Sequence, residues 1–395
     1  MHKYGGSSVA TPEKIRALAE ILKKRLQNDD KIVVIVSAMG KTTDNLIALA
    51  KDVAGSSPDP RELDMLLVTG EQVSAALLTM ALKSTGVRAI SRNAWQIEVV
   101  STEFHGDARI RDINALKLLR DLEEYNVVVV TGFQGISDSG HMTTLGRGSS
   151  DTLAVAIAAK LRVDCEIYSD VAGVYAFDPN KIPGVRKLDY IQYDEMLELA
   201  ALGAKVLHSR AVEVARRYNV KLYCGSTFSD ERGTYVVAQL PEWVEQPAVT
   251  GLALDRDQTK FALKRLPHTG DILSALFGAF AGTANVDMIA VTEDDITFTV
   301  KDADRERVAG LIRQHLDAYT GWEMEIAGGV AKVSAVGVGM NTATGVAGRF
   351  FSALRRENVG VLSVTTSDIN ISALLEAGEA DRAVMSLAAE FGLTS

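Results

Sequence analysis

The sequence has few cysteines and no long hydrophobic run. Among its 395 residues only Cys165 and Cys224 are cysteines, which is too few for a disulfide framework, and both lie in apolar, strand-like stretches. We therefore expect buried thiols and a reducing compartment, the cytoplasm. The most apolar stretches, at 32–36 and 127–130, are far too short to cross a bilayer. The polar, glycine-rich first residues predict no signal peptide.

Positive charge is in the minority, and several well-known catalytic motifs are missing. The formal net charge of -9 argues against nucleic acid or an anionic membrane surface as the main partner. The sequence contains no GxxxxGKS or GxxxxGKT and no GxGxxG after a strand, so it predicts neither a P-loop enzyme nor a dinucleotide-binding fold. It also lacks HExxH, CxxC and GxSxG, so we expect no protein-bound transition metal and no hydrolase nucleophile.

Apolar, β-branched runs alternate with stretches of helical periodicity up to about residue 235. The runs predict strands at 32–37, 127–132, 165–170 and 220–224. The periodic stretches predict helices at 12–27, 44–54, 62–84, 110–124, 151–161, 193–203 and 208–218. This alternation predicts an α/β fold with a central, mostly parallel sheet covered by helices. Ligands of such folds bind beyond the carboxyl ends of the strands.

The chain changes character after the polar, turn-rich segment 226–251. Two later segments share a Thr-Gly pair, an amphipathic helix, an Asn-Val pair and an Asp-Ile pair that opens a strand, and their equivalent residues keep one spacing. This pattern predicts the duplication of a small βαββ unit. The duplicated units either only dimerise or bind a small ligand, and the sequence leaves both open. We expect a first domain over 1–235, a linker over 236–258, and repeated units over 259–327 and 328–395.

A glycine-rich loop follows the first short strand. Lys3 precedes Gly5, Gly6 and Ser7, and a Thr-Pro pair then starts a helix. Glycine allows the backbone to approach a ligand closely, and the free N–H groups of a helix start attract an anion. An ordinary turn between a strand and a helix is the alternative interpretation.

Other strand-end loops add polar groups that suit an anionic substrate. Arg147 lies between two glycines, where a guanidinium can bind a carboxylate through two hydrogen bonds. Lys205 follows another glycine, and a buried lysine is costly unless an anion meets it. Glu71 is placed to receive a substrate ammonium group, although a favourable charge in the first turn of a helix is the simpler alternative.

These residue types fit phosphoryl transfer. That reaction needs positive charge and N–H donors around the transferred group, and an acceptor placed in line with it. An arginine and a carboxylate in addition suggest an acceptor that is itself an amino acid. We therefore interpret Lys3 and the Gly5-Gly6 pair as the phosphate-binding loop of a kinase.

The ordered loops resemble those of the aspartate kinases, which belong to the amino-acid kinase family. The resemblance covers essentially the whole chain and rests on KYGGSSV, SAMGKTTD, TGE, FHGDARI, GFQG, TTLGRGSSD, YSDVAGVY and EMLELAALGAKVLHSRAVE. It implies a kinase domain followed by two ACT domains of ferredoxin-like fold. The implied reaction converts L-aspartate and ATP, with Mg²⁺ on the nucleotide, into 4-phospho-L-aspartate, the first step towards lysine, threonine and methionine. It also implies a homodimer assembled through the ACT domains.

The resemblance also assigns site residues by position in the motifs. Lys3 and Asp151 match the catalytic residues. The substrate contacts correspond to Ser37, Thr43, Glu71, Arg147, Gly148, Ser149 and Ser150. Besides Lys3, the nucleotide contacts correspond to Gly5, Gly6, Ser7, Ser169, Asp170, Tyr175, Asn180, Lys181, Lys205 and Val206. No residue is assigned to a protein-bound metal.

Two positions depart from the family pattern. Ser149 replaces the second glycine of the usual GRGGSD, and Asn180 stands where an arginine is usual, with Lys181 as its candidate substitute. A kinase of glutamate or N-acetylglutamate is therefore the alternative enzyme, and a non-catalytic amino-acid sensor is the alternative of another class. The segment FHGDARI, the long insert around 41–110 and the tandem ACT domains disfavour the first alternative. The joint presence of the lysines, arginine and aspartate disfavours the second.

The same comparison predicts weak feedback control. Relatives inhibited by lysine or threonine carry a proline before the first ACT helix and a Gln-Asn pair on the following strand. This sequence has Thr269 at the first position and Val291 and Thr292 at the second, and the second unit has Thr344 in place of its proline. We expect weak or absent inhibition by lysine and threonine.

Overall fold

The structure is a computed structural model that describes residues 1–26, 31–202, 207–245, 247–266 and 269–394. The chain folds into two compact units. The first unit comprises Met1–Val174, Lys187–Ala200 and the described part of 205–244. The second comprises Tyr175–Arg186 and the described parts of 201–204 and 245–395.

An eight-stranded sheet forms the centre of the first unit, with strand order β10-β12-β11-β9-β1-β2-β6-β3. Its strands are β1 (His2–Tyr4), β2 (Ile32–Val36), β3 (Ala89–Arg92), β6 (Val127–Thr131), β9 (Cys165–Ser169), β10 (Tyr190–Gln192), β11 (Leu222–Ser226) and β12 (Thr234–Val237). All neighbours pair in parallel except β11 and β12. The predicted α/β fold with a mostly parallel sheet is confirmed, and β1 lies at its centre.

The helices of the first unit begin near the predicted positions. They are α1 (Pro12–Arg25), α2 (Thr42–Ala54), α3 (Pro60–Leu67), α4 (Thr69–Ser84), α5 (Ala115–Glu124), α6 (Ser149–Leu161), α7 (Tyr193–Ala201, which ends in the second unit) and α8 (Ser209–Tyr218). Thr11 caps α1, because its hydroxyl accepts a hydrogen bond from the backbone N–H of Lys14. The apolar faces of α1 and α4 pack on β1, β2 and β6 in one buried core.

The predicted helix over 110–124 is wrong in its first third. Residues Ile110–Ile113 form β5, which pairs with β4 (Val99–Ser101) in a small sheet of order β5-β4-β7-β8. The other strands of this sheet are β7 (Gln134–Ile136) and β8 (Met142–Thr144). A pair of isoleucines three residues apart fits one helical face, so the apolar spacing did not exclude a helix. The antiparallel neighbour β4 decides the conformation of this segment.

The predicted helix over 62–84 starts earlier and is interrupted. A turn at Val68 separates α3 from α4. By length and composition alone, Pro60–Ser84 could cross a membrane, but half of its apolar window is buried inside the protein. Leu78 and Leu82 belong to the core that α4 shares with α1. A core helix of a soluble protein passes the same test, so the segment is weak evidence for a membrane span.

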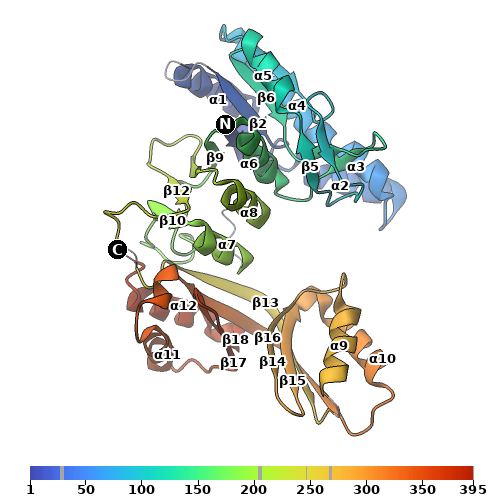
Figure 1. Cartoon of the computed structure of the whole chain (residues 1–395), viewed down its shortest axis with the longest axis vertical. Coiled ribbons are helices and arrows are strands. Elements are labelled where there is room, and N and C mark those ends of the chain that lie inside the picture. The colour runs from blue at the N-terminus through green and yellow to red at the C-terminus, as the bar shows by residue number, and fades with distance from the viewer. Residues whose placement is uncertain (27–30, 203–206, 246, 267–268, 395) are drawn as a thin grey trace. The chain divides into compact units, whose positions relative to one another are not determined.

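The second unit contains one six-stranded antiparallel sheet of order β14-β15-β13-β16-β18-β17. Its strands are β13 (Gly251–Lys264), β14 (Val286–Val291), β15 (Ile296–Lys301), β16 (Glu323–Val336), β17 (Ser363–Thr366) and β18 (Asn370–Glu376), and its helices are α9 (Thr269–Phe280), α10 (Arg305–Leu316), α11 (Val346–Arg356) and α12 (Ala380–Glu390). Figure 1 shows α9 and α10 beside one half of the sheet and α11 and α12 beside the other. Each half repeats strand, helix, two strands and helix, as the predicted ferredoxin-like duplication requires.

The two halves share their long strands. The start of β13, Gly251–Asp255, pairs with Lys332–Val336 of β16, while its later residues pair with β15. Residues 251–258, which we expected in the linker, therefore belong to this sheet. Residues 236–237 were expected in the linker too, but they end β12 in the sheet of the first unit. Nonlocal pairing of this kind leaves no local signal in the sequence. The boundaries 1–235, 236–258, 259–327 and 328–395 remain predictions.

Candidate active site

A cavity of about 290 Å³ opens at the carboxyl ends of the central strands of the first unit. Its lining comes from β1 and the loop after it, the loop after β2, the start of α2, the loop after β6, the start of α4, and the loop that leads into α6 with the first turn of that helix. The residues are Lys3, Gly6, Ser37, Ala38, Gly40, Thr43, Asp44, Glu71, Phe133, Arg147, Gly148 and Ser150. Because β1, β2 and β6 are parallel neighbours, the loops that follow them meet at one edge of the sheet.

The centre of this site is an ion pair between Lys3 and Asp151. Lys3 Nζ lies 2.7 Å from Asp151 Oδ1, and the two side chains are only 11% and 12% exposed. Lys3 stands on β1, and Asp151 stands in the first turn of α6. A buried lysine is stable here because the carboxylate meets it. Lys3 lines the cavity and Asp151 lies behind it, and the catalytic roles of the two residues remain predictions.

Gly6 allows the first two loops to touch. A Cβ at Gly6 would lie 2.7 Å from the carbonyl oxygen of Ala38, which is closer than real atoms approach. The backbone N–H of Gly40 donates to the carbonyl of Gly6 at 3.1 Å. Any larger residue at Gly6 would therefore separate the loop after β1 from the loop after β2.

Glu71 is a buried carboxyl group at the start of α4. It is 3% exposed, and its Oε1 accepts a hydrogen bond of 3.0 Å from the backbone N–H of Ala38. Its Oε2 is buried and finds no hydrogen-bond partner among the described residues. Burial raises the pKa of Glu71 to about 7. A bound ammonium group would supply the missing partner and favour the ionised form.

This pKa predicts a pH dependence of substrate binding. If Glu71 binds the ammonium group, the value of kcat/KM for the amino-acid substrate should fall about tenfold per pH unit well below pH 7, because the neutral acid loses the charge interaction. Initial rates between pH 5.5 and 8.5 measure it. Glu71→Gln should give a low value without this titration. The same titration in Glu71→Gln would show that another group causes it.

Arg147 is held in the glycine-rich loop before α6. Its side chain is 76% exposed and its Nη2 lies 3.0 Å from Asp44 Oδ1. Gly148 adopts φ +76°, and a Cβ there would lie 2.6 Å from Cδ2 of His208. Only glycine fits this conformation without moving His208. The loop therefore places Arg147 at the cavity, and His208 at the start of α8 packs against the backbone of the loop.

Ser149 and Ser150 face different surroundings. The Ser149 hydroxyl donates to the carbonyl of Gly146 at 2.6 Å, and Ser149 is absent from the cavity lining, whereas Ser150 is part of it. The substitution of the family's glycine by Ser149 thus adds a hydrogen bond inside the loop. Arg210 of α8 holds the same loop, since its Nη1 donates to the carbonyl of Leu145 at 2.6 Å.

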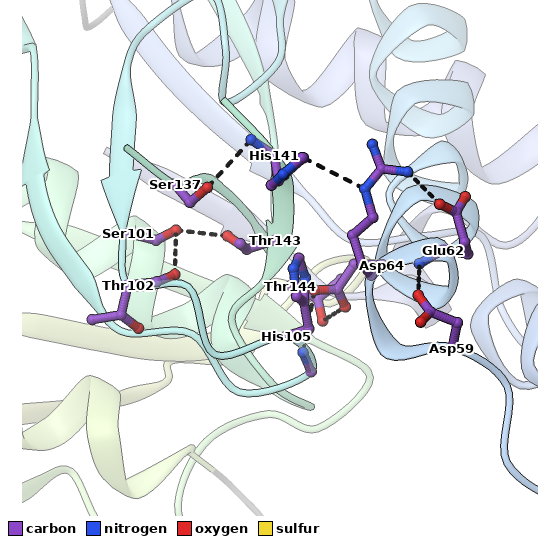
Figure 2. A network of polar contacts seen from close by, with 12 residues as sticks. Asp59, Glu62, Asp64, Ser101, Thr102, His105, Ser137, His141, Thr143 and Thr144 are labelled. Carbon is purple, nitrogen blue, oxygen red and sulfur yellow. Dashed lines mark hydrogen bonds and ion pairs between the residues drawn. The ribbon is translucent and has the colours of Figure 1, made fainter. Parts of the chain in front are cut away.

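A polar network fixes the segment before this loop (Figure 2). Asp64 of α3 is 1% exposed and accepts hydrogen bonds from the hydroxyl of Thr144 at 2.5 Å and the backbone N–H of Gly106 at 3.2 Å. His105 Nδ1 lies 2.8 Å from the second carboxylate oxygen of Asp64, Oδ2. Thr144 ends β8, and the glycine-rich loop follows directly. His105 is therefore a structural histidine that positions this loop.

The loops after β1, β9 and β11 carry the small hydroxyl residues expected near a nucleotide. Ser8 Oγ lies 2.7 Å from Thr227 Oγ1, and Thr227 Oγ1 donates to the carbonyl of Ser169 at 3.1 Å. Ser7 is half-buried beside them, and Asp170 is exposed. These contacts join the loop that holds Ser7 to the end of β9, where Ser169 is the last residue and Asp170 follows.

The remaining nucleotide candidates lie outside the first unit or outside the described residues. Tyr175, Asn180 and Lys181 lie in the second unit. There the backbone and the amide of Asn180 both donate to Asp178, at 3.0 and 3.1 Å, and Lys181 Nζ lies 4.0 Å from the same carboxylate. Lys205 and Val206 lie outside the described residues. Their assignment to the nucleotide remains a prediction.

Four lining residues were not among the predicted site residues. Ala38 supplies its N–H group to Glu71, and Gly40 supplies the contact with Gly6. Asp44 pairs with Arg147, and Phe133 adopts φ +68° directly after β6. The position of Phe133 after a buried strand was a usable signal, because such loops carry the ligand contacts in parallel sheets.

Comparison with known proteins places the chain in a family. A sequence model of the amino acid kinase family matches residues 1–226, and one of the ACT domain matches residues 333–391. The chain belongs to the amino acid kinase family. An aspartate kinase of Stutzerimonas stutzeri is 43% identical over 401 residues, covering 100% of this amino acid kinase and 97% of that protein. Aspartokinase 2 of Bacillus subtilis is 41% identical over 400 residues, covering 100% and 98%.

A solved structure supports the same grouping. The structure of aspartokinase III of E. coli in complex with aspartate and ADP, in the R-state, superposes on this amino acid kinase with a TM-score of 0.85. The two are 25% identical, and the match covers 99% of both chains. The predicted order of a kinase domain followed by ACT domains is therefore confirmed.

Proposed function

We propose that this chain is an aspartate kinase, which transfers the terminal phosphoryl group of ATP to the side-chain carboxylate of L-aspartate. The products are 4-phospho-L-aspartate and ADP. The observation that carries the proposal is the cavity that Lys3, Glu71 and Arg147 line together, with Asp151 paired to Lys3. Full-length relatives named aspartate kinase support it.

The charges of the cavity fit the three ionic groups of aspartate. Arg147 suits the α-carboxylate, because a guanidinium binds a carboxylate through two parallel hydrogen bonds. The buried, unpaired Oε2 of Glu71 suits the ammonium group. Lys3 then remains for the side-chain carboxylate and the phosphoryl group, whose negative charge it stabilises in the transition state. Asp151 holds Lys3 in place.

ATP is proposed to lie on the other side of Lys3, against Gly5, Gly6, Ser7, Ser169 and Asp170. Mg²⁺ would arrive on its phosphates and neutralise part of their charge. The described residues form no group of three or more His, Cys, Asp or Glu that could hold a metal ion, so the phosphates would supply most of its ligands. Lys205, Val206, Tyr175, Asn180 and Lys181 are further candidates for the nucleotide.

A substrate comparison tests the function. ADP release should be fast with L-aspartate and slow with L-glutamate and N-acetyl-L-glutamate, and hydroxylamine should trap an acyl phosphate only with aspartate. A preference for either glutamate compound would favour the alternative kinase. Absence of ADP release with all three would favour the amino-acid sensor.

We further propose a cytoplasmic homodimer assembled through the second unit. β14 and β17 are the edge strands of its sheet. They and the preceding loop expose large apolar side chains, namely Ile289, Val291, Val361, Leu362 and Val364. Edge strands with apolar side chains tend to pair with another chain. The mass of the protein in solution tests this assembly.

Feedback inhibition by lysine and threonine should be weak. Val291 carries no hydrogen-bonding side chain, and Thr292 is engaged in its own turn, where its N–H donates to the carbonyl of Asp295 at 2.9 Å. An amino-acid effector that binds without hydrogen bonds from amide side chains buries polar groups that have no partner. Each such group costs about 1–3 kcal/mol of binding free energy. Micromolar inhibition would then become millimolar.

A titration of each amino acid, alone and together, against initial rate measures this effect. We expect less than half inhibition at about 1 mM of either amino acid. Half inhibition at tens of micromolar would contradict the proposal. The double variant Val291→Gln/Thr292→Asn should strengthen inhibition, and Met385→Gln, on the exposed face of α12, is its control.

A further inference from the structure

A second cavity of the first unit has no assigned role. It measures about 460 Å³ and lies between β5, α6 and α8. It shares no lining residue with the cavity around Lys3. Its volume is in the range of sites that hold small molecules, about 300–1,000 Å³.

The lining is basic in a chain whose net charge is -9. Five basic side chains line the cavity, namely Arg109, Arg111, Lys160, Arg210 and Arg217, and its acidic side chains are Asp112 and Glu213. The positive charges crowd one another: burial, and then the charge of Arg109, lowers the pKa of Arg210. Such crowding favours a bound anion.

Four of the basic groups already have carboxylate partners, among them Arg210, whose Nη1 lies 3.0 Å from Asp107 Oδ1. Lys160 pairs with Asp112 at 2.5 Å, Arg109 pairs with Asp107 at 3.4 Å, and Arg111 pairs with Asp138. Arg217 differs, since within the part of the chain that the structure describes it forms no ion pair and only lies over the ring of Tyr218. Its guanidinium is therefore available to a ligand.

The inner wall of the cavity is apolar. Ile113 is buried there, and Ala156 and Ala159 give α6 a face of small side chains opposite Val214 of α8. Thr152 also lines this wall. It is 3% exposed, and its hydroxyl is buried without a hydrogen-bond partner among the described residues. A buried hydroxyl without a partner is costly, and a polar ligand atom would relieve that cost.

We propose that this cavity binds a small organic anion, a carboxylate or a phosphate carried on a short apolar body. The anion meets Arg217 and its basic neighbours, and the apolar body lies against the alanines of α6. The site is also joined to the catalytic cavity. Thr152 follows Asp151 on α6, and Arg210 holds the carbonyl of Leu145 before the glycine-rich loop. A bound anion should therefore change the affinity for the amino-acid substrate.

Calorimetry with four probes tests the ligand class. The probes are 4-methyl-2-oxopentanoate, 3-methylbutyl phosphate, inorganic phosphate and uncharged 3-methyl-1-butanol. Saturable binding of one molecule per chain should occur with either of the first two, and the tighter one identifies the anionic group. Tighter binding of inorganic phosphate or of the alcohol would overturn the assignment of the ligand class.

Variants locate the binding. Arg217→Gln should weaken the better probe by about threefold to fivefold, near the upper effect of one exposed charge pair, and Ala156→Phe should abolish binding by filling the cavity. Arg216→Gln is the matched control, because Arg216 is the neighbouring arginine of α8, pairs with Asp194 at 2.9 Å and does not line the cavity. Equal binding by all three variants would overturn the site.

A separate kinetic experiment tests whether the bound anion changes the affinity for aspartate. Only this experiment rests on the proposed kinase activity. The better probe should change the KM for aspartate in the wild type and not in Ala156→Phe. If the probe binds without changing the KM for aspartate, the link between the two cavities is wrong, whereas the binding site itself stands. Absence of kinase activity in the presence of normal calorimetric binding would instead contradict the proposed function.

Discussion

Replacing Lys3 by alanine should lower kcat by about 10²–10³-fold, the loss found when one group that stabilises charge in a transition state is removed. The KM for aspartate should change much less, because Lys3 acts mainly on charge that develops at the phosphoryl group. Lys3 is buried at the cavity and contacts Asp151 at 2.7 Å. Steady-state ADP release with each substrate varied in turn measures both constants. An unchanged kcat in the folded variant would contradict the catalytic assignment.

The variant also removes the partner of a buried carboxylate. Breaking a buried pair in this way costs about 3–5 kcal/mol of stability, so Lys3→Ala could lose activity by unfolding. The double variant Lys3→Met/Asp151→Asn removes both charges and should recover most of the thermal stability without recovering activity. Lys23→Ala is the surface control, because Lys23 lies on the exposed side of α1 and donates to the carbonyl of Thr85 at 2.8 Å. Recovery of activity in the double variant would mean that Lys3 has a structural role.

The sequence was sufficient to bring several of the predicted site residues to one cavity, although their roles remain predictions. Lys3 lies on β1, Glu71 at the start of α4, and Arg147 and Ser150 in the segment that opens α6. The parallel pairing of β1, β2 and β6 brings the loops after these strands to one edge of the sheet. Asp151 needed one step more, since only the direction of α6 turns it toward Lys3. Local motifs and the rule for parallel sheets were enough for this part.

Features that depend on nonlocal pairing were not predicted. The strand over Ile110–Ile113 exists because β4 lies beside it, and the same four residues would also fit a helix. The start of β13 pairs with a strand far along the chain, so it was assigned to a linker. Phe133 and Asp44 line the cavity because of the backbone conformation after β6 and the ion pair with Arg147. Neither property can be seen from residue type alone.

The ion pair between Arg147 and Asp44 suggests how aspartate enters the site. Both side chains are exposed, at 76% and 60%, and such a pair is worth only about 0–1 kcal/mol. A substrate carboxylate that forms two charged hydrogen bonds with the guanidinium can displace Asp44, because such bonds are stronger than a single exposed contact. Asp44 therefore keeps Arg147 near the cavity and competes weakly with the substrate.

This competition leads to opposite results for two substitutions. Arg147→Lys should raise the KM for aspartate about tenfold or more, since an ammonium group cannot replace the planar pair of hydrogen bonds and each bond to a charged group is worth about 1.5–3 kcal/mol. Asp44→Asn should instead lower that KM, by less than about fivefold, because only a weak competitor is lost. The KM for ATP should stay unchanged in both, and Arg16→Lys, which alters a comparable exposed pair with Glu13, should change neither constant. A parallel rise of both KM values in Arg147→Lys would place this arginine on the nucleotide side of Lys3, and a raised KM for aspartate in Asp44→Asn would make Asp44 a substrate contact.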